Sequence, residues 1–100
     1  MLTQKKVIEI LKNEMPFLAE EYGVKKIGLF GSYARGKQHR KSDIDILMEF
    51  GRPIGLKFVE LADYLEKVLG RKVDILTPAG IKGIRIKSVA SEIKRSIVYV

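Results

Sequence analysis

The stretch from Gly31 to Asp45 constrains this chain most, because it links two apolar runs through a small turn and a polar loop. Gly31-Ser32 follows the apolar run at 25–30, and Asp43 and Asp45 open the next apolar run. A glycine turn before a short helix lets backbone N–H groups approach phosphate, while two aspartates at i and i+2 of a strand share one face. This arrangement favours a phosphate site beside a divalent-metal site, and therefore chemistry on a nucleoside triphosphate.

The apolar spacing alternates between helical and strand periods along the chain, which predicts a mixed α/β (α+β) sandwich. Pro16 lies inside the first helical pattern, so a kink or break is expected near Met15. No linker or repeat interrupts the pattern, and residues 1–100 are expected to form one domain. Helices are expected at 3–22, 56–69 and 84–97, strands at 25–30, 43–50 and 72–76, a helical turn at 32–37, a polar loop at 38–42 and a tail at 98–100.

The composition narrows the partners and the compartment. The chain has 19 Lys and Arg against 12 Asp and Glu, a net charge of +7, which suits an acidic partner, a nucleic acid or a polyphosphate ligand. A solvated lysine-rich surface explains the same excess, because the positive charges are spread along the chain. The sequence has no cysteine, which excludes disulfides and thiolate metal sites, and no run of about 18 apolar residues that could span a membrane. We expect a cytoplasmic protein.

The turn at Gly31 offers three groups suited to phosphate. Gly31 has no Cβ, Ser32 adds a hydroxyl, and Arg35 one turn later carries a forked donor that matches phosphate oxygens. An ordinary strand-to-helix turn with a serine N-cap is the alternative. The same residues begin like a Walker A loop, Gly-x-x-x-x-Gly-Lys, but Gln38 stands where that motif needs Ser or Thr for the metal. We therefore reject the Walker A interpretation.

Three aspartates are candidates for metal ligands. Asp43 and Asp45 would repel each other on one strand face, and a hard divalent cation would remove that repulsion. Asp74 lies inside the apolar run 72–76, where a buried acid needs a partner; the alternative is an edge strand with its acid in water. Three carboxylates can hold two Mg²⁺ ions for in-line nucleotidyl displacement, with Asp74 as metal ligand or general base. The strand at 43–50 would place Ile44, Ile46 and Met48 on one face and Asp45, Leu47 and Glu49 on the other.

The other polar residues of this stretch are weaker candidates. Tyr33 is expected to pack under the turn rather than to contact a nucleotide. His39 is the only histidine and has no evident partner in the sequence, so we do not assign it as a base. The basic loop residues Lys37, Arg40 and Lys41 are expected to be solvated, with contact to the triphosphate or to a partner as the alternatives.

Gly31-Ser32, ten residues and then Asp43-x-Asp45 resembles the signature of the nucleotidyltransferases related to DNA polymerase beta. The longer string, Gly-Ser-x-Ala-Arg-Gly followed by Ser42-Asp43-Ile44-Asp45, is similar to that of the minimal nucleotidyltransferases, the MntA-like antitoxins. The resemblance covers essentially the whole chain. It implies a small mixed sheet with helices packed on one face, together with Mg²⁺ and ATP. It assigns nucleotide binding to Gly31, Ser32, Arg35 and Ser42, metal binding to Asp43 and Asp45, and the third carboxylate to Asp74.

The same resemblance implies a partner and a reaction. Minimal nucleotidyltransferases accompany RNA-cleaving toxins of the HEPN class and are understood to neutralise them by moving AMP from ATP onto a toxin tyrosine. Two alternatives stay open. One is an antitoxin that masks its partner by contact alone, and the other is a small-molecule nucleotidyltransferase, which is disfavoured because no acceptor domain is evident. We do not expect direct nucleic-acid binding, and the sequence leaves a homo-oligomer open.

Overall fold

A four-stranded mixed sheet forms the centre of the structure, a computed structural model that describes residues 2–83 and 87–100. The strand order is β3-β2-β1-β4, so that within the described part of the chain β3 and β4 are the edges. The β1 strand (Val24–Phe30) is antiparallel to β2 (Ile44–Phe50) and to β4 (Val98–Tyr99), whereas β2 is parallel to β3 (Val73–Leu76). The mixed α/β prediction is confirmed.

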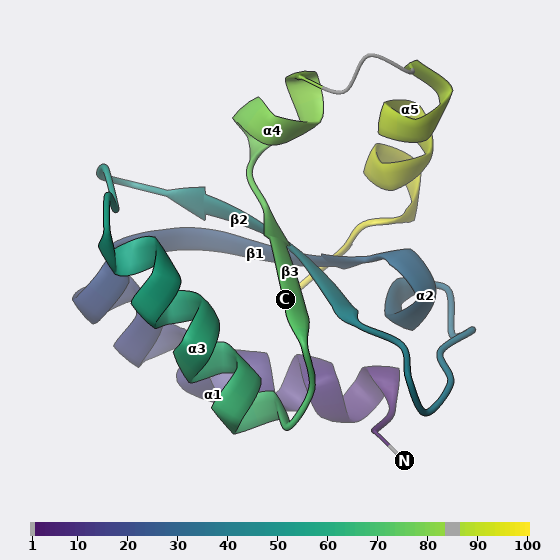
Figure 1. Cartoon of the computed structure of the whole chain (residues 1–100), viewed down its shortest axis with the longest axis horizontal. Helices are drawn as coiled ribbons and strands as arrows, with labels where there is room; N and C mark the ends of the chain where they lie inside the picture. The colour runs from purple at the N-terminus through teal and green to yellow at the C-terminus, as the bar shows by residue number, and fades with distance from the viewer. Residues whose placement is uncertain (1, 84–86) are drawn as a thin grey trace.

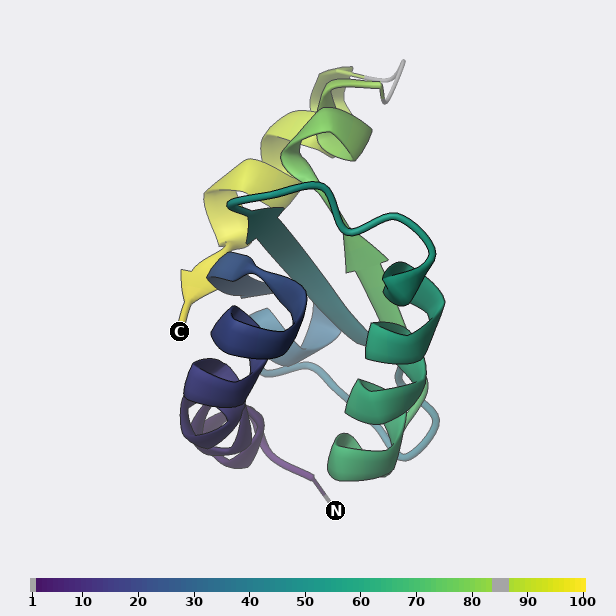
Figure 2. The same ribbon diagram turned by 90° about the vertical axis from the view of Figure 1, so that its left-hand side faces the viewer.

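Helices cover both faces of the sheet (Figures 1 and 2). One face carries α1 (Gln4–Tyr22) and α3 (Lys57–Leu69), the other carries α4 (Pro78–Lys82) and α5 (Lys87–Ser96), and the single-turn helix α2 (Gly31–Ala34) follows β1. The resemblance implied helices on one face of the sheet only, and this prediction is wrong for this chain. The reason is that Phe30 and Leu47 face away from α1 and need an apolar cover, which Ile81 of α4 provides.

The β2 strand alternates between the two faces as the sequence predicted. Ile44, Ile46 and Met48 are fully buried and join the larger core with α1 and α3. The opposite face carries Asp45, Leu47 and Glu49, and Leu47 joins the smaller core under α4 and α5. Because side chains alternate with a period of two, one strand contributes to the main core with one face and carries the acidic residues on the other.

The first helix runs through Pro16 without ending. Thr3 caps it, since its hydroxyl accepts a hydrogen bond of 3.1 Å from the Lys6 N–H, and Gly23 ends it in the left-handed conformation. A break near Met15 is therefore wrong. Buried leucines on both sides of Pro16, Leu11 and Leu18, anchor the helix to the sheet and outweigh the one backbone hydrogen bond that proline removes.

The C-terminal third holds two elements that the sequence did not predict. Thr77-Pro78 follows β3 and begins a further helix. The Thr77 hydroxyl accepts from the Gly80 N–H at 3.1 Å, and Pro78 begins α4. The expected tail at 98–100 contains β4, whose Tyr99 pairs with Gly28 of β1. The helix expected at 84–97 is described at Lys87–Ser96, and residues 84–86 lie outside the described residues. No described helix is both long and apolar enough to cross a membrane.

Candidate active site

Gly31 joins β1 to α2 and brings the backbone onto the carboxylate of Asp45. The last residue of β1, Phe30, pairs with Asp45 of β2, so the turn begins directly beside that aspartate. Gly31 has a φ of +72°, and a Cβ at this position would collide with Oδ2 of Asp45. A glycine is therefore needed twice, for its backbone conformation and for the close approach.

Asp45 is the electrostatic centre of the site. It is half-buried, and its pKa is raised, first by this burial, then by the negative charges of Asp74 and of Asp43. The Arg35 guanidinium acts in the opposite direction and lowers the pKa of Asp45. The three sequence-predicted aspartates therefore lie close enough to sense one another, and Asp45 has an energetic reason to accept a cation.

Asp74 lies beside Asp45, as the sequence predicted, but it is not in a buried strand. The β3 strand lies parallel to β2 with Asp74 in register with Asp45. Asp74 is exposed because β3 is an edge strand, so the alternative of an edge acid in water is the one observed. Asp43 is half-buried one residue before β2, which begins at Ile44 and not at the predicted residue 43.

The donor set fits a hard divalent cation only in part. Within residues 2–83 and 87–100, no three His, Cys, Asp or Glu side chains are grouped closely enough to enclose a metal ion. Asp43 and Asp45 supply carboxylate oxygens from two ends of one short segment, which is the chemistry that Mg²⁺ prefers, and Mg²⁺ commonly takes its remaining ligands from substrate phosphates and water. Asp43 and Asp45 are therefore the candidate ligands, and Asp74 is the neighbouring acid.

Ser32 and Arg35 lie on the other side of Asp45, in and just after α2. Ser32 is half-buried in the single turn of this helix, and Arg35 is exposed at its C-terminal end. The helical turn expected at 32–37 is shorter than expected, since α2 ends at Ala34. A hydroxyl and a guanidinium beside the aspartates can orient a triphosphate that a metal ion holds.

Ser42 closes the loop that returns to the aspartates. Its buried hydroxyl accepts a hydrogen bond of 2.9 Å from the His39 N–H, and its own N–H donates to the His39 carbonyl at 3.0 Å. The Nδ1 of His39 in turn accepts from the Lys41 N–H at 3.3 Å. These contacts give Ser42 and His39 a structural role in the loop, while the assignment of Ser42 to nucleotide binding stays a prediction.

Tyr33 packs under the turn, as expected. It is fully buried in the main core, and within the described residues its hydroxyl has no hydrogen-bond partner.

The sequence reasoning missed a cavity of about 350 Å³ on the same sheet face as Asp45. The available signal was that Leu47 and Glu49 share the face of Asp45. The rest of the lining comes from α4, α5 and the segment leading into β4, which only the fold brings together.

Comparison with known proteins shows the family to which this chain belongs. A family model described as a nucleotidyltransferase domain matches residues 5–100. A Methanocaldococcus jannaschii protein provisionally named a protein adenylyltransferase is 44% identical over 103 residues, with 100% of both chains covered. The protein adenylyltransferase MntA of Thermococcus cleftensis is 42% identical over 101 residues, with 100% of this chain and 98% of that one covered.

Solved structures agree with the sequence relatives. A structure provisionally described as a minimal nucleotidyltransferase matches with a TM-score of 0.72 at 26% identity, over 97% of this chain and 95% of that one. A toxin–antitoxin crystal structure with AMP-PNP matches with a TM-score of 0.63 at 27% identity, over 98% of this chain and 72% of that one. The fold and the site define an enzyme that transfers nucleotidyl groups. This chain belongs to the nucleotidyltransferase domain family.

Proposed function

We propose that this chain is a Mg²⁺-dependent protein adenylyltransferase that moves AMP from ATP to a tyrosine hydroxyl of a HEPN-type RNase toxin, and thereby acts as its antitoxin. The observation that carries the proposal is the crowding of Asp43 and Asp74 around Asp45, with the Gly31 backbone held against the Asp45 carboxylate. Relatives named protein adenylyltransferase support the reaction, and the neighbouring toxin–antitoxin structure with AMP-PNP supports the nucleotide and the kind of partner.

The side chains divide the reaction between them. Bound Mg²⁺ would neutralise phosphate charge and lower the pKa of the attacking hydroxyl. Asp43 and Asp45 would hold the cation, while Ser32 and Arg35 would orient the triphosphate oxygens. The acceptor oxygen attacks the α-phosphorus, the bond from that phosphorus to the oxygen bridging to the β-phosphate breaks, and pyrophosphate leaves. The acceptor proton passes to the exposed Asp74 carboxylate as general base.

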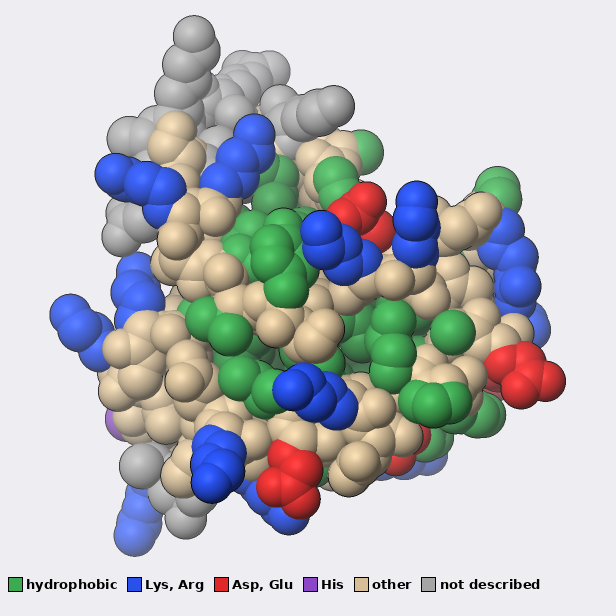
Figure 3. Space-filling view, turned by 180° about the vertical axis from the view of Figure 1, so that it is seen from behind, with side chains coloured by type: hydrophobic (Ala, Val, Ile, Leu, Met, Phe, Trp, Pro, Cys, Tyr) green, Lys and Arg blue, Asp and Glu red, His purple; other side chains and the backbone are tan. Residues whose placement is uncertain are grey.

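The position of Asp74 also fits an acceptor that belongs to another molecule. Asp74 is exposed on β3, an edge strand of the described sheet, so a bulky substrate can approach it from solvent. A tyrosine on the surface of a folded partner needs this kind of access. Nucleic acid fits less well: on the face shown in Figure 3, Lys and Arg side chains are scattered among hydrophobic and acidic side chains rather than gathered in one stripe.

The second candidate function is an antitoxin that works by contact alone. Two exposed apolar side chains at the start of α3 favour it, Leu56 at 96% and Val59 at 66% exposure, since such residues are suited to a partner surface. Together with the net charge of +7, they would suit an acidic toxin. This candidate requires no function for the aspartates.

The deciding experiment uses labelled ATP, Mg²⁺ and a candidate toxin encoded beside this chain, a small helical protein with an Arg-x-x-x-x-His motif. The wild type should label the toxin on a tyrosine, as mass spectrometry would locate, and Asp43→Asn should abolish labelling. The matched control is Asp63→Asn, which makes the same chemical change at an exposed position on α3. An unlabelled toxin, or labelling that survives Asp43→Asn, contradicts the proposal. If Asp43→Asn still neutralises the toxin at wild-type affinity, masking by contact is correct.

A further inference from the structure

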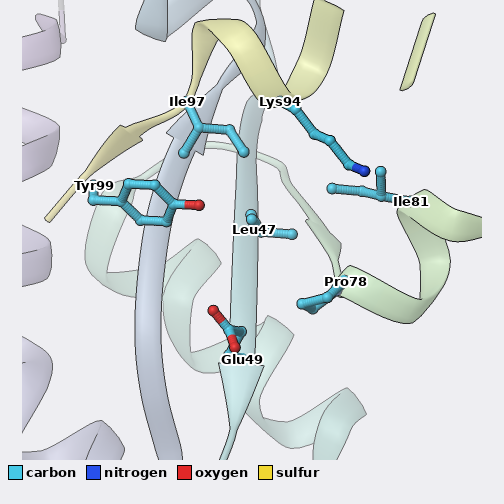
Figure 4. A pocket seen from close by; sticks show the side chains of 7 residues that line it. All are labelled: Leu47, Glu49, Pro78, Ile81, Lys94, Ile97 and Tyr99. Atoms are coloured by element: carbon cyan, nitrogen blue, oxygen red, sulfur yellow. The ribbon is translucent and has the colours of Figure 1, made fainter. Parts of the chain in front are cut away.

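A cavity lies between the sheet and the two C-terminal helices, on the face that carries Asp45. Figure 4 shows its side chains converging from separate elements around one space. The cavity holds about 350 Å³, at the small end of the range for small-molecule sites, and suits a single flat ring system. Its lining is Leu47 and Glu49 of β2, Pro78 and Ile81 of α4, Lys94 of α5, and Ile97 and Tyr99 near the C-terminus.

The cavity and Asp45 share one face of β2. Asp45, Leu47 and Glu49 follow one another at every second residue and so share one face. At about 3.3 Å per residue, Leu47 lies roughly 7 Å and Glu49 roughly 13 Å from Asp45 along the strand. A nucleotide whose phosphates are bound at Asp45 can therefore extend its base over Leu47 toward Glu49.

One wall of the cavity is already fixed by packing on Gly28. A Cβ at Gly28 would lie 2.6 Å from Cγ2 of Ile97 and 3.2 Å from the ring of Tyr99, so the absence of a side chain lets both residues lie close on β1. The Lys26 Nζ lies 4.2 Å from the centroid of the Tyr99 ring, a cation–π contact. The Tyr99 hydroxyl points toward Leu47 (Figure 4). The ring and the aliphatic side chains form a preorganised apolar wall.

Two charged side chains give the cavity a hydrogen-bonding pattern. The Glu49 carboxylate is half-buried, accepts hydrogen bonds only, and within the described residues has no hydrogen-bond or ion-pair partner. Lys94 contributes an ammonium that only donates. Glu49 and Lys94 lie at two ends of the cavity (Figure 4). Adenine offers an amine donor on one edge and a ring-nitrogen acceptor on the opposite edge, which complements this pair, whereas guanine places the acceptor O6 where adenine has its amine.

We propose that this cavity is the base-binding subsite of the nucleotide, with adenine on Leu47 against the wall of Ile97 and Tyr99. The exocyclic amine donates to the Glu49 carboxylate, and a ring nitrogen accepts from Lys94. Glu49 is therefore a specificity-determining residue that favours ATP over GTP. The proposal rests on the proposed function only in placing the triphosphate at Asp43 and Asp45.

The test compares equilibrium binding of ATP, GTP and inorganic triphosphate to the full chain by titration calorimetry in Mg²⁺. Glu49→Gln should weaken ATP binding about tenfold, the value of a hydrogen bond to a charged acceptor, and should leave triphosphate binding unchanged. It should also narrow the preference for ATP over GTP. The matched control Glu60→Gln, on the exposed part of α3, should change none of these affinities.

The outcomes separate this proposal from the proposed function. If Asp43→Asn removes Mg²⁺-dependent triphosphate binding while Glu49→Gln leaves ATP affinity and base preference intact, the base subsite is wrong and the metal–triphosphate site stands. Equal losses of ATP and triphosphate on Glu49→Gln also overturn the base subsite, because Glu49 would then act on the phosphates. If triphosphate binds independently of Mg²⁺ and Asp43, the proposed function itself fails.

Discussion

The two faces of β2 show how one strand separates folding from chemistry. On the face toward α1 and α3, Ile44, Ile46 and Met48 are fully buried. On the opposite face, Asp45 and Glu49 are half-buried acidic side chains, and only Leu47 between them joins the smaller core with α4 and α5. The neighbouring residues Asp45 and Ile46 therefore have different roles. A substitution at Asp45 should reduce AMP transfer without lowering stability, whereas a substitution at Ile46 should lower stability without reducing AMP transfer per folded molecule.

The largest effect is expected on the core face. Ile46→Ala should lower the free energy of unfolding by about 2–5 kcal/mol, because it leaves a cavity in a fully buried position. AMP transfer per folded molecule should remain near wild type. Urea unfolding and transfer assays at matched folded concentration would measure both. The control Val59→Ala removes apolar volume at an exposed position and should change stability by less than about 0.5 kcal/mol. A loss below about 1 kcal/mol for Ile46→Ala would contradict the assignment of this face.

Gly31→Ala tests the contact between the turn and Asp45. Displacing the carboxylate by about an ångström should reduce transfer roughly a hundredfold, while the strained backbone should cost about 1–3 kcal/mol of stability. Gly70→Ala is the matched control: its φ of +70° brings similar strain, but no atom lies within 4 Å of the added Cβ. Near-wild-type transfer for Gly31→Ala, or equal activity losses in both variants, would show that the collision with Asp45 is unimportant.

Asp45 should make the stability of the protein depend on pH in the absence of Mg²⁺. Its folded-state pKa is raised, so the folded state holds the proton more tightly than the unfolded state does. The free energy of unfolding therefore falls as pH rises from the ordinary aspartate pKa through the raised one. Asp45→Asn should remove this fall and be the more stable protein above that window, with the difference vanishing in acid. Urea unfolding across pH would measure it, and a difference that does not vary with pH would exclude this origin.

The smallest effect is expected at Leu56. Its side chain is 96% exposed, so Leu56→Ser should change the free energy of unfolding by less than about 0.5 kcal/mol. Thermal or urea unfolding would check this value. A clear destabilisation would mean that Leu56 packs against the protein in solution, and that the start of α3 is not a free surface for a partner.

The sequence predicted the local geometry of the candidate site better than its surroundings. The i, i+2 spacing placed Asp45, Leu47 and Glu49 on one face of β2, because this arrangement depends on local geometry. The contact of Gly31 with Asp45 depends instead on the pairing of β1 with β2 and was not predicted. The exposure of Asp74 to solvent could not be predicted from local geometry. It depends on β3 being an edge strand, and strand order is a property of the whole sheet.

The C-terminal third was harder to predict for related reasons. Thr77-Pro78 is typical both of a strand stop and of a helix start, and α4 is too short for its apolar spacing to decide. The β4 strand has two residues, and its pairing depends on the distant Gly28. The cavity next to Asp45 combines these two elements with β2, so it could not be inferred from any single segment.

The central claim is that Asp45, on the acidic face of β2, serves AMP transfer and contributes little to folding. The most direct measurement is AMP transfer and the free energy of unfolding of Asp45→Asn at neutral pH, with Mg²⁺ present in the transfer assay. We predict a loss of transfer of about a hundredfold or more, since a catalytic metal supplies several kcal/mol, together with stability equal to or above that of the wild type. Transfer that persists in a folded Asp45→Asn protein would contradict the account.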